Sequence, residues 1–503
     1  MKESEKSALS IYNSLSREKE VFEPINPPFV GLYVCGPTVY GDPHLGHARS
    51  AVCFDIIYRY LKKLGFKVRY VRNITDVGHM EFELSESGED KILKRARLEE
   101  VEPMEIVQRY TISYHKGMDA LNCLRPDIEP TASGHIIEQI NLVKKILKNG
   151  YAYEVNGNIY FDLDKFSNAE SYGELSGKVL EDLQSGSRDT SGMEEKRSPH
   201  DFALWKRATE SHIMRWDSPW GEGYPGWHLE CTAMSTKYLG EQFDIHGGGL
   251  DLQFPHHEAE IAQSKGAYGH GPVKYWIHNN MITIDGAKMS KSAGNFINLE
   301  DLFTGNHEKL KKGFHPLIVR FLMLQSHYRS KIDFSNDALE AAEKGYTRLM
   351  SAMNLLDQLN APSGLESSDQ KLDREIVKAC ERCHQTMNDD FNTAQTLAAV
   401  FELVAKVNAF HNQQLDIKTV SSTTFQNMCD TLETFVYDVL GLKQVENADN
   451  GITEELINLL IDIRLDAKGK RDFETSDKIR DDLEAIGVKL KDDKSGTTFE
   501  IDH

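Results

Sequence analysis

The chain has 503 residues, 78 acidic and 58 basic side chains, and a formal net charge of −20. Its length predicts several domains, and the absence of an apolar run long enough to span a bilayer argues against a membrane protein. Seven scattered cysteines argue against a disulfide framework, and the polar N-terminus has no signal-peptide core, so we expect a reducing, cytoplasmic location. The acidity excludes a uniformly basic nucleic-acid binder but allows RNA binding through a locally positive face.

The N-terminal region contains a strand–loop–helix–strand unit. Residues 29–34 form an apolar run of buried-strand length, a helical pattern runs over 46–64, and residues 66–74 predict a second strand. Such a unit opens a nucleotide-binding α/β sheet, whose ligands lie beyond the carboxyl ends of the strands and at helix N-termini. The chemically active residues at that edge are Cys35, His44 and His47.

The sequence pattern changes in the middle of the chain. A predicted helix over 136–148 precedes a hairpin that turns at Asn156-Gly157, and a polar tract follows over 181–198. This block separates two parts of the predicted sheet, so we interpret it as an insertion. We expect the polar tract to be mobile.

Residues 225–295 contain the densest group of candidate functional side chains. Pro225-Gly226 predicts a helix start, and a short strand over 243–246 is followed by three glycines. On the next predicted helix His256 and Glu260 are four residues apart and share a face, whereas His257 and Glu258 are expected on other faces. A further strand is predicted over 273–278.

The C-terminal part is predominantly helical. Helices predicted over 371–388, 392–411 and 422–440 suggest an antiparallel bundle. The tail predicts two more helices, at 452–467 and 473–486, and then a hairpin that pairs 488–490 with 498–501. Two amphipathic segments precede the bundle, at 316–325 and 336–358.

Two signatures and three longer stretches carry a resemblance. His44-Leu45-Gly46-His47 resembles the HIGH signature of class I aminoacyl-tRNA synthetases, with a conservative leucine for isoleucine, and Lys288-Met289-Ser290-Lys291-Ser292 matches their KMSKS signature. The stretches 33–36, 225–231 and 254–260 resemble the bacterial cysteinyl-tRNA synthetase family in particular. The match runs in order from about residue 30 to the C-terminus.

The resemblance implies an α/β Rossmann-type catalytic domain with an inserted connective domain. An α-helical bundle and a small mixed α/β C-terminal anticodon-binding domain would follow. The expected ranges are 1–132 and 227–272 for the two catalytic halves, 133–226 for the insertion, 273–337 for the KMSKS-bearing stem-contact region, 338–445 for the bundle and 451–503 for the C-terminal domain.

The resemblance also implies one zinc ion per chain, held by Cys35, Cys231, His256 and Glu260. Thiolate, imidazole and carboxylate all suit Zn²⁺. Zinc binds a thiolate strongly and an alcohol weakly, so it would separate cysteine from serine, and Glu260 is the ligand expected to loosen for the substrate. From the residues alone, either cysteine is more often a buried apolar side chain.

For the nucleotide, the resemblance implies a catalytic role for His44, Gly46, His47, Lys288 and Lys291. The two histidines and the two lysines would bind ATP, and Mg²⁺ would accompany it. Alone, a basic loop of this kind is usually a solvated surface.

For cysteine, the resemblance implies a pocket lined by Thr75, Trp227 and His246. Each residue also has a purely structural explanation. Thr75 could bond to its own backbone in a loop, Trp227 could pack the start of a helix, and His246 could be a strand-end histidine with its hydrogen bonds made within the protein.

The implied reaction is an ATP-dependent ligation of cysteine to tRNA(Cys), so the expected partners are ATP, L-cysteine and tRNA(Cys), with no membrane and a monomeric chain. Phe499 stands where the family usually has tryptophan, which leaves the anticodon contact open. Three alternatives remain: a paralogue that joins cysteine to an amino sugar, which would not need the long C-terminal half; a non-catalytic RNA-binding protein with a structural zinc; and a zinc hydrolase, for which no H-E-x-x-H motif is present.

Overall fold

The computed structural model describes residues 8–77, 91–178, 195–210, 212–289, 294–362, 368–445, 450–492 and 497–501. Contacts between residues divide the chain into two compact units, Met1–Lys443 and Gln444–His503, which are described separately below. Among the described helices, none combines the length and the apolar character needed to cross a bilayer.

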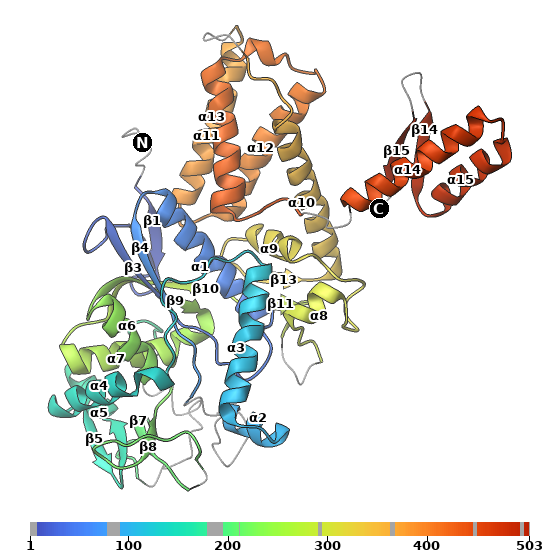
Figure 1. Cartoon of the computed structure of the whole chain (residues 1–503). Helices are drawn as coiled ribbons and strands as arrows, with labels where there is room; N and C mark the ends of the chain where they lie inside the picture. The colour runs from blue at the N-terminus through green and yellow to red at the C-terminus, as the bar shows by residue number, and fades with distance from the viewer. Residues whose placement is uncertain are drawn as a thin grey trace. The chain divides into compact units, whose positions relative to one another are not determined.

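A four-stranded parallel sheet organises the first unit (Figure 1). Its strands are β3 (Phe29–Val34), β4 (Lys67–Arg72), β9 (Phe243–Gly249) and β10 (Val273–Asn279), in the spatial order β10-β9-β3-β4. The chain therefore reverses its winding direction between β3 and β9, and such a switch point is where an open α/β sheet forms its ligand crevice. The predicted α/β Rossmann-type sheet is confirmed.

Three helices cover this sheet and point their ends at the crevice. Helix α1 (Leu45–Lys63) connects β3 to β4, α6 (Leu229–Leu239) precedes β9, and α7 (His256–Tyr268) connects β9 to β10. The predicted start of α6 at Pro225-Gly226 is wrong, because Gly223–Pro225 forms strand β8, and Pro225 pairs with Trp205. Trp227 and His228 therefore precede the helix.

Two further details differ from the sequence-based expectation. The three glycines do not follow a short strand but form the last residues of β9, and Gly247 packs so tightly that an added Cβ would lie 2.1 Å from the ring of Phe54. Strand β10 hydrogen-bonds to β9, so the sheet itself continues past the boundary expected at residue 272.

The insertion folds into an antiparallel sheet with the order β5-β6-β7-β8. The Asn156-Gly157 turn joins β5 to β6 with positive φ angles of 52° and 84°, as its sequence predicted. The elements are α4 (Ile136–Lys148), β5 (Ala152–Val155), β6 (Asn158–Phe161), α5 (Leu163–Ala169), β7 (Phe202–Arg207) and β8. Most of the polar tract 181–198 lies outside the described residues.

Helices follow the sheet, as predicted. Helices α11, α12 and α13 stand side by side in the bundle, and α10 contacts both α9 and α12 (Figure 1). The bounds are α9 (Pro316–Leu324), α10 (Asn336–Leu356), α11 (Gln370–Asn388), α12 (Thr393–His411) and α13 (Ser422–Glu433), which continues as a π-helical stretch over Thr434–Val439.

Smaller elements complete the first unit. An N-terminal hairpin is formed by β1 (Ser10–Asn13) and β2 (Glu18–Val21), and α2 (Lys91–Glu99) and α3 (Pro103–Ala120) lie between β4 and the insertion in the sequence. A three-stranded sheet contains β11 (Ile282–Ile284), β12 (Ala287–Lys288) and β13 (Ile332–Phe334), and α8 (Leu299–Thr304) follows β12.

The second unit is a small mixed α/β module. It contains α14 (Asn450–Gly469), α15 (Phe473–Ala485) and the predicted hairpin of β14 (Val488–Asp492) and β15 (Thr497–Ile501). Its buried core consists of Ile457, Ile461, Leu483 and Val488, and Phe499 packs against that core.

Candidate functional site

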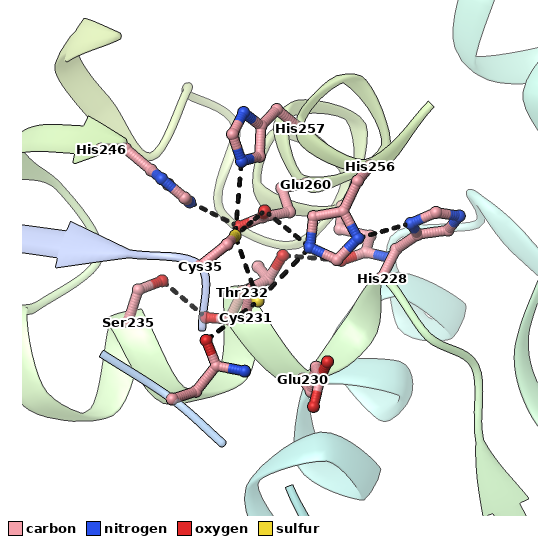
Figure 2. Close-up of polar contacts among 12 residues, drawn as sticks. Cys35, His228, Glu230, Cys231, Thr232, Ser235, His246, His256, His257 and Glu260 are labelled. Atoms are coloured by element: carbon pink, nitrogen blue, oxygen red, sulfur yellow. Dashed lines mark hydrogen bonds and ion pairs between the residues drawn. The ribbon is translucent and has the colours of Figure 1, made fainter. Parts of the chain in front are cut away.

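Four side chains from three segments converge at the carboxyl edge of the sheet (Figure 2). Cys35 follows β3, Cys231 lies in the first turn of α6, and His256 and Glu260 lie one turn apart on α7. One potential ligand atom from each of the four lies within 4.8 Å of the others, and the last three residues are at most 2% exposed. We call these four residues the thiol cluster.

The distances inside the thiol cluster suit a shared metal ion. The two sulfur atoms are 3.5 Å apart, and His256 Nε2 lies 3.4 Å from Cys231 Sγ. Glu260 Oε1 lies 3.7 Å from Cys35 Sγ and 3.3 Å from His256 Nε2. Two sulfurs, one imidazole nitrogen and one carboxylate oxygen are donors that a tetrahedral zinc site uses.

Two more histidines border the cluster. His257 Nε2 lies 3.3 Å from Cys35 Sγ, and His246 Nε2 lies 2.9 Å from Glu260 Oε2. Cys35, His246, His257 and Glu260 form a second group with metal-ligand spacing. The expectation that His257 faces elsewhere is wrong: His256 and His257 are the first two residues of α7, and both rings reach the crevice from there. Glu258 does face away, where it accepts hydrogen bonds from the backbone of Gly173 and Ser176 at 2.9 Å each.

Outer hydrogen bonds orient the histidines. His256 Nδ1 lies 3.0 Å from His228 Nδ1, and His257 Nδ1 lies 2.8 Å from His278 Nε2. Such partners fix the tautomer and ring orientation of a metal-binding imidazole. Sequence reasoning missed His228 and His278, although both lie within the histidine-rich segment 225–295 that it singled out.

Burial strongly perturbs the thiols. Loss of solvation raises the pKa of Cys231 to about 12, and burial together with the hydrogen bond to Cys231 raises the pKa of Cys35 well above its ordinary value. The two thiols are therefore protonated at neutral pH unless a positive charge joins them, and a metal cation that binds here displaces protons.

The start of α1 is a histidine capping box. His44 Nδ1 accepts a hydrogen bond from the Gly46 backbone N–H at 3.0 Å, and the His44 backbone N–H donates to His47 Nδ1 at 3.2 Å. The two rings stack with their centroids 3.9 Å apart. An added Cβ on Gly46 would lie 2.8 Å from the His44 ring, so glycine leaves the room that this stack needs.

The hydrogen bonds of this helix cap determine the tautomer of His47. Burial, and the neighbouring His44, lower the pKa of His47 well below its ordinary value, so the ring is neutral. Because Nδ1 of His47 accepts, its single proton is on Nε2. His47 therefore offers one N–H donor at a helix N-terminus, a place that attracts phosphate oxygens.

The chain after the KMSKS signature returns to the start of α1, which carries the first signature. The Lys288 backbone pairs with Thr283 in the β11–β12 hairpin, whereas Lys291 lies outside the described residues. After the loop, Asn298 forms a β-bridge with His44, and the ring of Phe296 lies 5.0 Å from the His44 ring. The segment that follows the KMSKS loop therefore lies against the start of α1.

Of the three residues expected to bind cysteine, Trp227 and His246 contact the thiol cluster directly, and Thr75 bonds to Glu230, the neighbour of Cys231. The Trp227 ring lies 4.7 Å from the His256 ring, and His246 contacts Glu260 as described. The hydroxyl of Thr75, just beyond β4, donates to Glu230 at 2.6 Å. Thr75 is therefore bonded to a side chain of α6 and not only to its own backbone.

Comparison with known proteins agrees with this layout. Residues 21–344 match the catalytic domain family described as tRNA synthetases class I (C), and residues 382–444 match the DALR domain family. A cysteine–tRNA ligase from Cytophaga hutchinsonii is 57% identical over 97% of this chain and 98% of its own length. One from Porphyromonas gingivalis is 54% identical over 98% of this chain and 99% of its own.

Solved structures show the same fold at low identity. Methionyl-tRNA synthetase from Mycobacterium tuberculosis, in complex with methionyl-adenylate, matches with a TM-score of 0.59 at 14% identity over 82% of this chain and 91% of its own. Thermus thermophilus arginyl-tRNA synthetase matches with a TM-score of 0.53 at 15% identity over 86% and 84%. With the family match over most of the first unit and full-length relatives above half identity, this chain belongs to the cysteine–tRNA ligase family of the class I tRNA synthetases.

Proposed function

We propose that this chain ligates L-cysteine to tRNA(Cys) in two steps, adenylation by ATP and transfer to the terminal ribose. The observation that carries the proposal is that Cys35 of the thiol cluster and the histidine-capped start of α1 both follow the carboxyl end of β3, at the switch point of the sheet. The cluster contributes donors for a metal ion, and the helix start contributes donors for a phosphate. Their common origin at this strand end suits a reaction between a thiol-bearing amino acid and a nucleotide.

The thiol cluster is proposed to hold one zinc ion through Cys35, Cys231, His256 and Glu260. This set contains both thiols, whereas the alternative group contains only one, and zinc favours thiolate ligands. His257 and His246 then remain as neighbours that donate hydrogen bonds to Cys35 and Glu260. Zinc supplies selective affinity for the thiolate of cysteine over the hydroxyl of serine, a difference that pocket shape alone discriminates poorly.

The start of α1 is proposed to bind ATP. His47 and His44 would donate from Nε2 to phosphate oxygens, because their Nδ1 atoms are engaged in the helix cap. Lys288 and Lys291 would add positive charge as pyrophosphate leaves, and Mg²⁺ would accompany the nucleotide. Stabilisation of charge and alignment of the reacting groups are the main contributions that a protein makes to such a displacement.

The remaining partners follow from the modules outside the sheet. The second unit and the helical bundle are proposed to contact tRNA. Phe499 packs against the core of the second unit but is only partly buried, so it is one candidate there for base stacking. Thr75, Trp227 and His246 are proposed to line the cysteine pocket.

The test is cysteine-dependent ATP–pyrophosphate exchange, with serine and a zinc-chelated sample as controls. We expect exchange with cysteine, little with serine, loss on chelation and recovery on addition of zinc. Exchange that survives complete zinc removal would contradict the metal's role and leave the ligase. No exchange with any amino acid, and no charging of tRNA(Cys), would contradict the enzymatic function.

A further inference from the structure

A buried chain of hydrogen bonds leads from the thiol cluster to Glu230. The Gly36 backbone N–H donates to Asn73 Oδ1 at 2.9 Å, Asn73 Nδ2 donates to Thr75 Oγ1 at 3.1 Å, and Thr75 Oγ1 donates to Glu230 Oε1 at 2.6 Å. Cys231 Sγ lies 3.7 Å from Asn73 Oδ1, so the chain begins at the cluster. Asn73, Thr75 and Glu230 are each at most 2% exposed.

The directions of these bonds follow from chemistry. A backbone N–H can only donate, so the Asn73 atom that faces Gly36 is the carbonyl oxygen, and the atom that faces Thr75 is the amide nitrogen. The Thr75 hydroxyl must therefore accept from Asn73. Its single proton goes to Glu230, since a carboxylate has none to give.

Thr75 is thereby fixed as an acceptor toward the pocket. A hydroxyl has one proton and two lone pairs, and the proton and one lone pair are used in the chain. The remaining lone pair can only receive a hydrogen bond. The polar group of an amino acid that donates hydrogen bonds is the α-ammonium, whereas its carboxylate only accepts.

Glu230 adds a negative charge at the same place. It directly precedes Cys231 on α6, and Figure 2 shows its carboxylate apart from the sulfur atoms and the α7 side chains. Thr75 donates directly to this carboxylate, and it also pairs with the loop after β3 through a bridge to Thr38. A cation that meets Thr75 is thus favoured by the charge behind it, while an anion is disfavoured.

We propose that Glu230 and Asn73 are positioning residues that hold the Thr75 hydroxyl as the acceptor for the α-ammonium group of the substrate. The thiol cluster then recognises the side chain of the substrate, and the Asn73–Thr75–Glu230 chain recognises its amino group. Because both parts share Asn73, the two recognition elements are held in a fixed relation. The inference rests on the proposed binding of cysteine at this edge.

The experiment compares two thiols that differ in the group in question. Cysteamine has a thiol and an ammonium but no carboxylate, and 3-mercaptopropionate has a thiol and a carboxylate but no ammonium. Each is titrated into the zinc-loaded full-length chain by calorimetry and tested as an inhibitor of cysteine-dependent pyrophosphate exchange. The variant is E230Q, and the matched control is E258Q, which alters a buried glutamate on the far side of α7.

We expect E230Q to weaken cysteamine binding and to raise the KM for L-cysteine by about tenfold or more, because the amide removes the negative charge behind Thr75 and can donate to its hydroxyl, which then loses its fixed role as an acceptor for the ammonium group. Binding of 3-mercaptopropionate, zinc content and the KM for ATP should change by less than about twofold on the same scale. E258Q should not alter the ratio of the two thiol affinities. The double variant E230Q/T75V should discriminate no worse than T75V alone, because Glu230 acts through Thr75.

Equal weakening of both thiols by E230Q would overturn the proposal, and so would an unchanged cysteamine affinity. If E230Q does not fold, the same two titrations are made with T75V. A T75V variant that still prefers cysteamine over 3-mercaptopropionate would overturn the proposal. If the parent chain shows no pyrophosphate exchange, the proposed function fails while the calorimetric comparison still decides this inference. A parent chain that binds neither thiol would overturn both.

Discussion

The carboxyl edge of the sheet in the first unit, which we call the catalytic edge after its proposed role, and the C-terminal module differ sharply in how they bury side chains. At the edge, Cys231, His246, His256, His257 and Glu260 are all at most 2% exposed, although each carries a polar or ionisable group. In the described part of the module, the core cluster has four buried members, while apolar side chains stay in solvent, among them Leu459 at 54% and Ile486 at 74%.

The difference in burial fits the two kinds of recognition proposed above. A buried polar cluster is held in place by its own hydrogen bonds and by the sheet, so it suits a small ligand that requires exact placement. A thin module with a small core depends on little buried area, so it suits a role in which a large partner adds contact surface. The contrast can be tested by substitutions and truncations on each side of it.

Replacement of a cluster sulfur should abolish catalysis. We expect C231A to lose zinc and to reduce cysteine-dependent pyrophosphate exchange by roughly a thousandfold, because a ligand and the substrate's anchor disappear together. The matched control is C380A, which removes a buried thiol on α11 of the helical bundle, outside the thiol cluster. Zinc content and exchange are measured on both, and a fully active C231A would contradict the cluster's role.

Loss of Arg320 should destabilise the first unit. This fully buried guanidinium binds Asp55 on α1 at 2.5 Å, the Leu440 carbonyl at 2.8 Å and the Leu121 carbonyl at 3.0 Å. R320A leaves a buried carboxylate without this partner, so we expect a loss of about 3–5 kcal/mol in the free energy of unfolding.

The control for this variant is K311A, which removes an exposed lysine paired with Asp337 and Glu340. Its effect should stay below about 1 kcal/mol, as for other surface ion pairs. Chemical denaturation measures both variants. Similar losses of unfolding free energy in R320A and K311A would show that burial of the ion pair does not determine the loss.

Removal of the module should separate the two steps of the proposed reaction. A chain that ends at Lys443 keeps the described site residues, so we expect pyrophosphate exchange within about threefold of the full chain and charging of tRNA(Cys) reduced by about a hundredfold. Equal loss of both activities would indicate that the module supports the catalytic edge instead.

Acid should destabilise the catalytic unit through its buried histidines. Burial, with His246 nearby, lowers the pKa of His278 to about 3, below its ordinary value. The folded state then binds fewer protons than the unfolded state between about pH 3 and 6.5, so stability is full above that range and falls by up to about 1.4 kcal/mol per pH unit as the pH drops. Denaturation of metal-free H278N at pH 7 and pH 5 should show a shallower dependence than the parent; an unchanged slope would contradict this origin.

Within the module, burial should separate two neighbouring positions on α14. I461A truncates a core residue that is 5% exposed and should cost about 2 kcal/mol of the module's stability. L459A removes a largely exposed side chain and should change stability by less than about 0.5 kcal/mol. Hydrogen exchange of the module's amides measures both, and equal costs would show that Leu459 is covered in solution.

Much of the fold follows from local sequence. The strand over 29–34, the helix over 136–148 and the Asn156-Gly157 turn appear where their patterns predict them. These features depend on residues within one or two turns of each other, and neighbouring residues carry that information. The start of α6 was misplaced because Pro225 pairs with Trp205 in a sheet that its neighbours do not reveal.

The candidate site divides in the same way. The two signatures and the shared helix face of His256 and Glu260 can be recognised in the sequence, since an i,i+4 spacing places two side chains on one face of a helix. The folded chain was needed to see that Cys35 meets Cys231 across 196 residues, that His257 joins them, and that Asn73 and Thr75 reach Glu230. These contacts depend on the order of the parallel strands and on the packing of α6 and α7, which no local periodicity specifies.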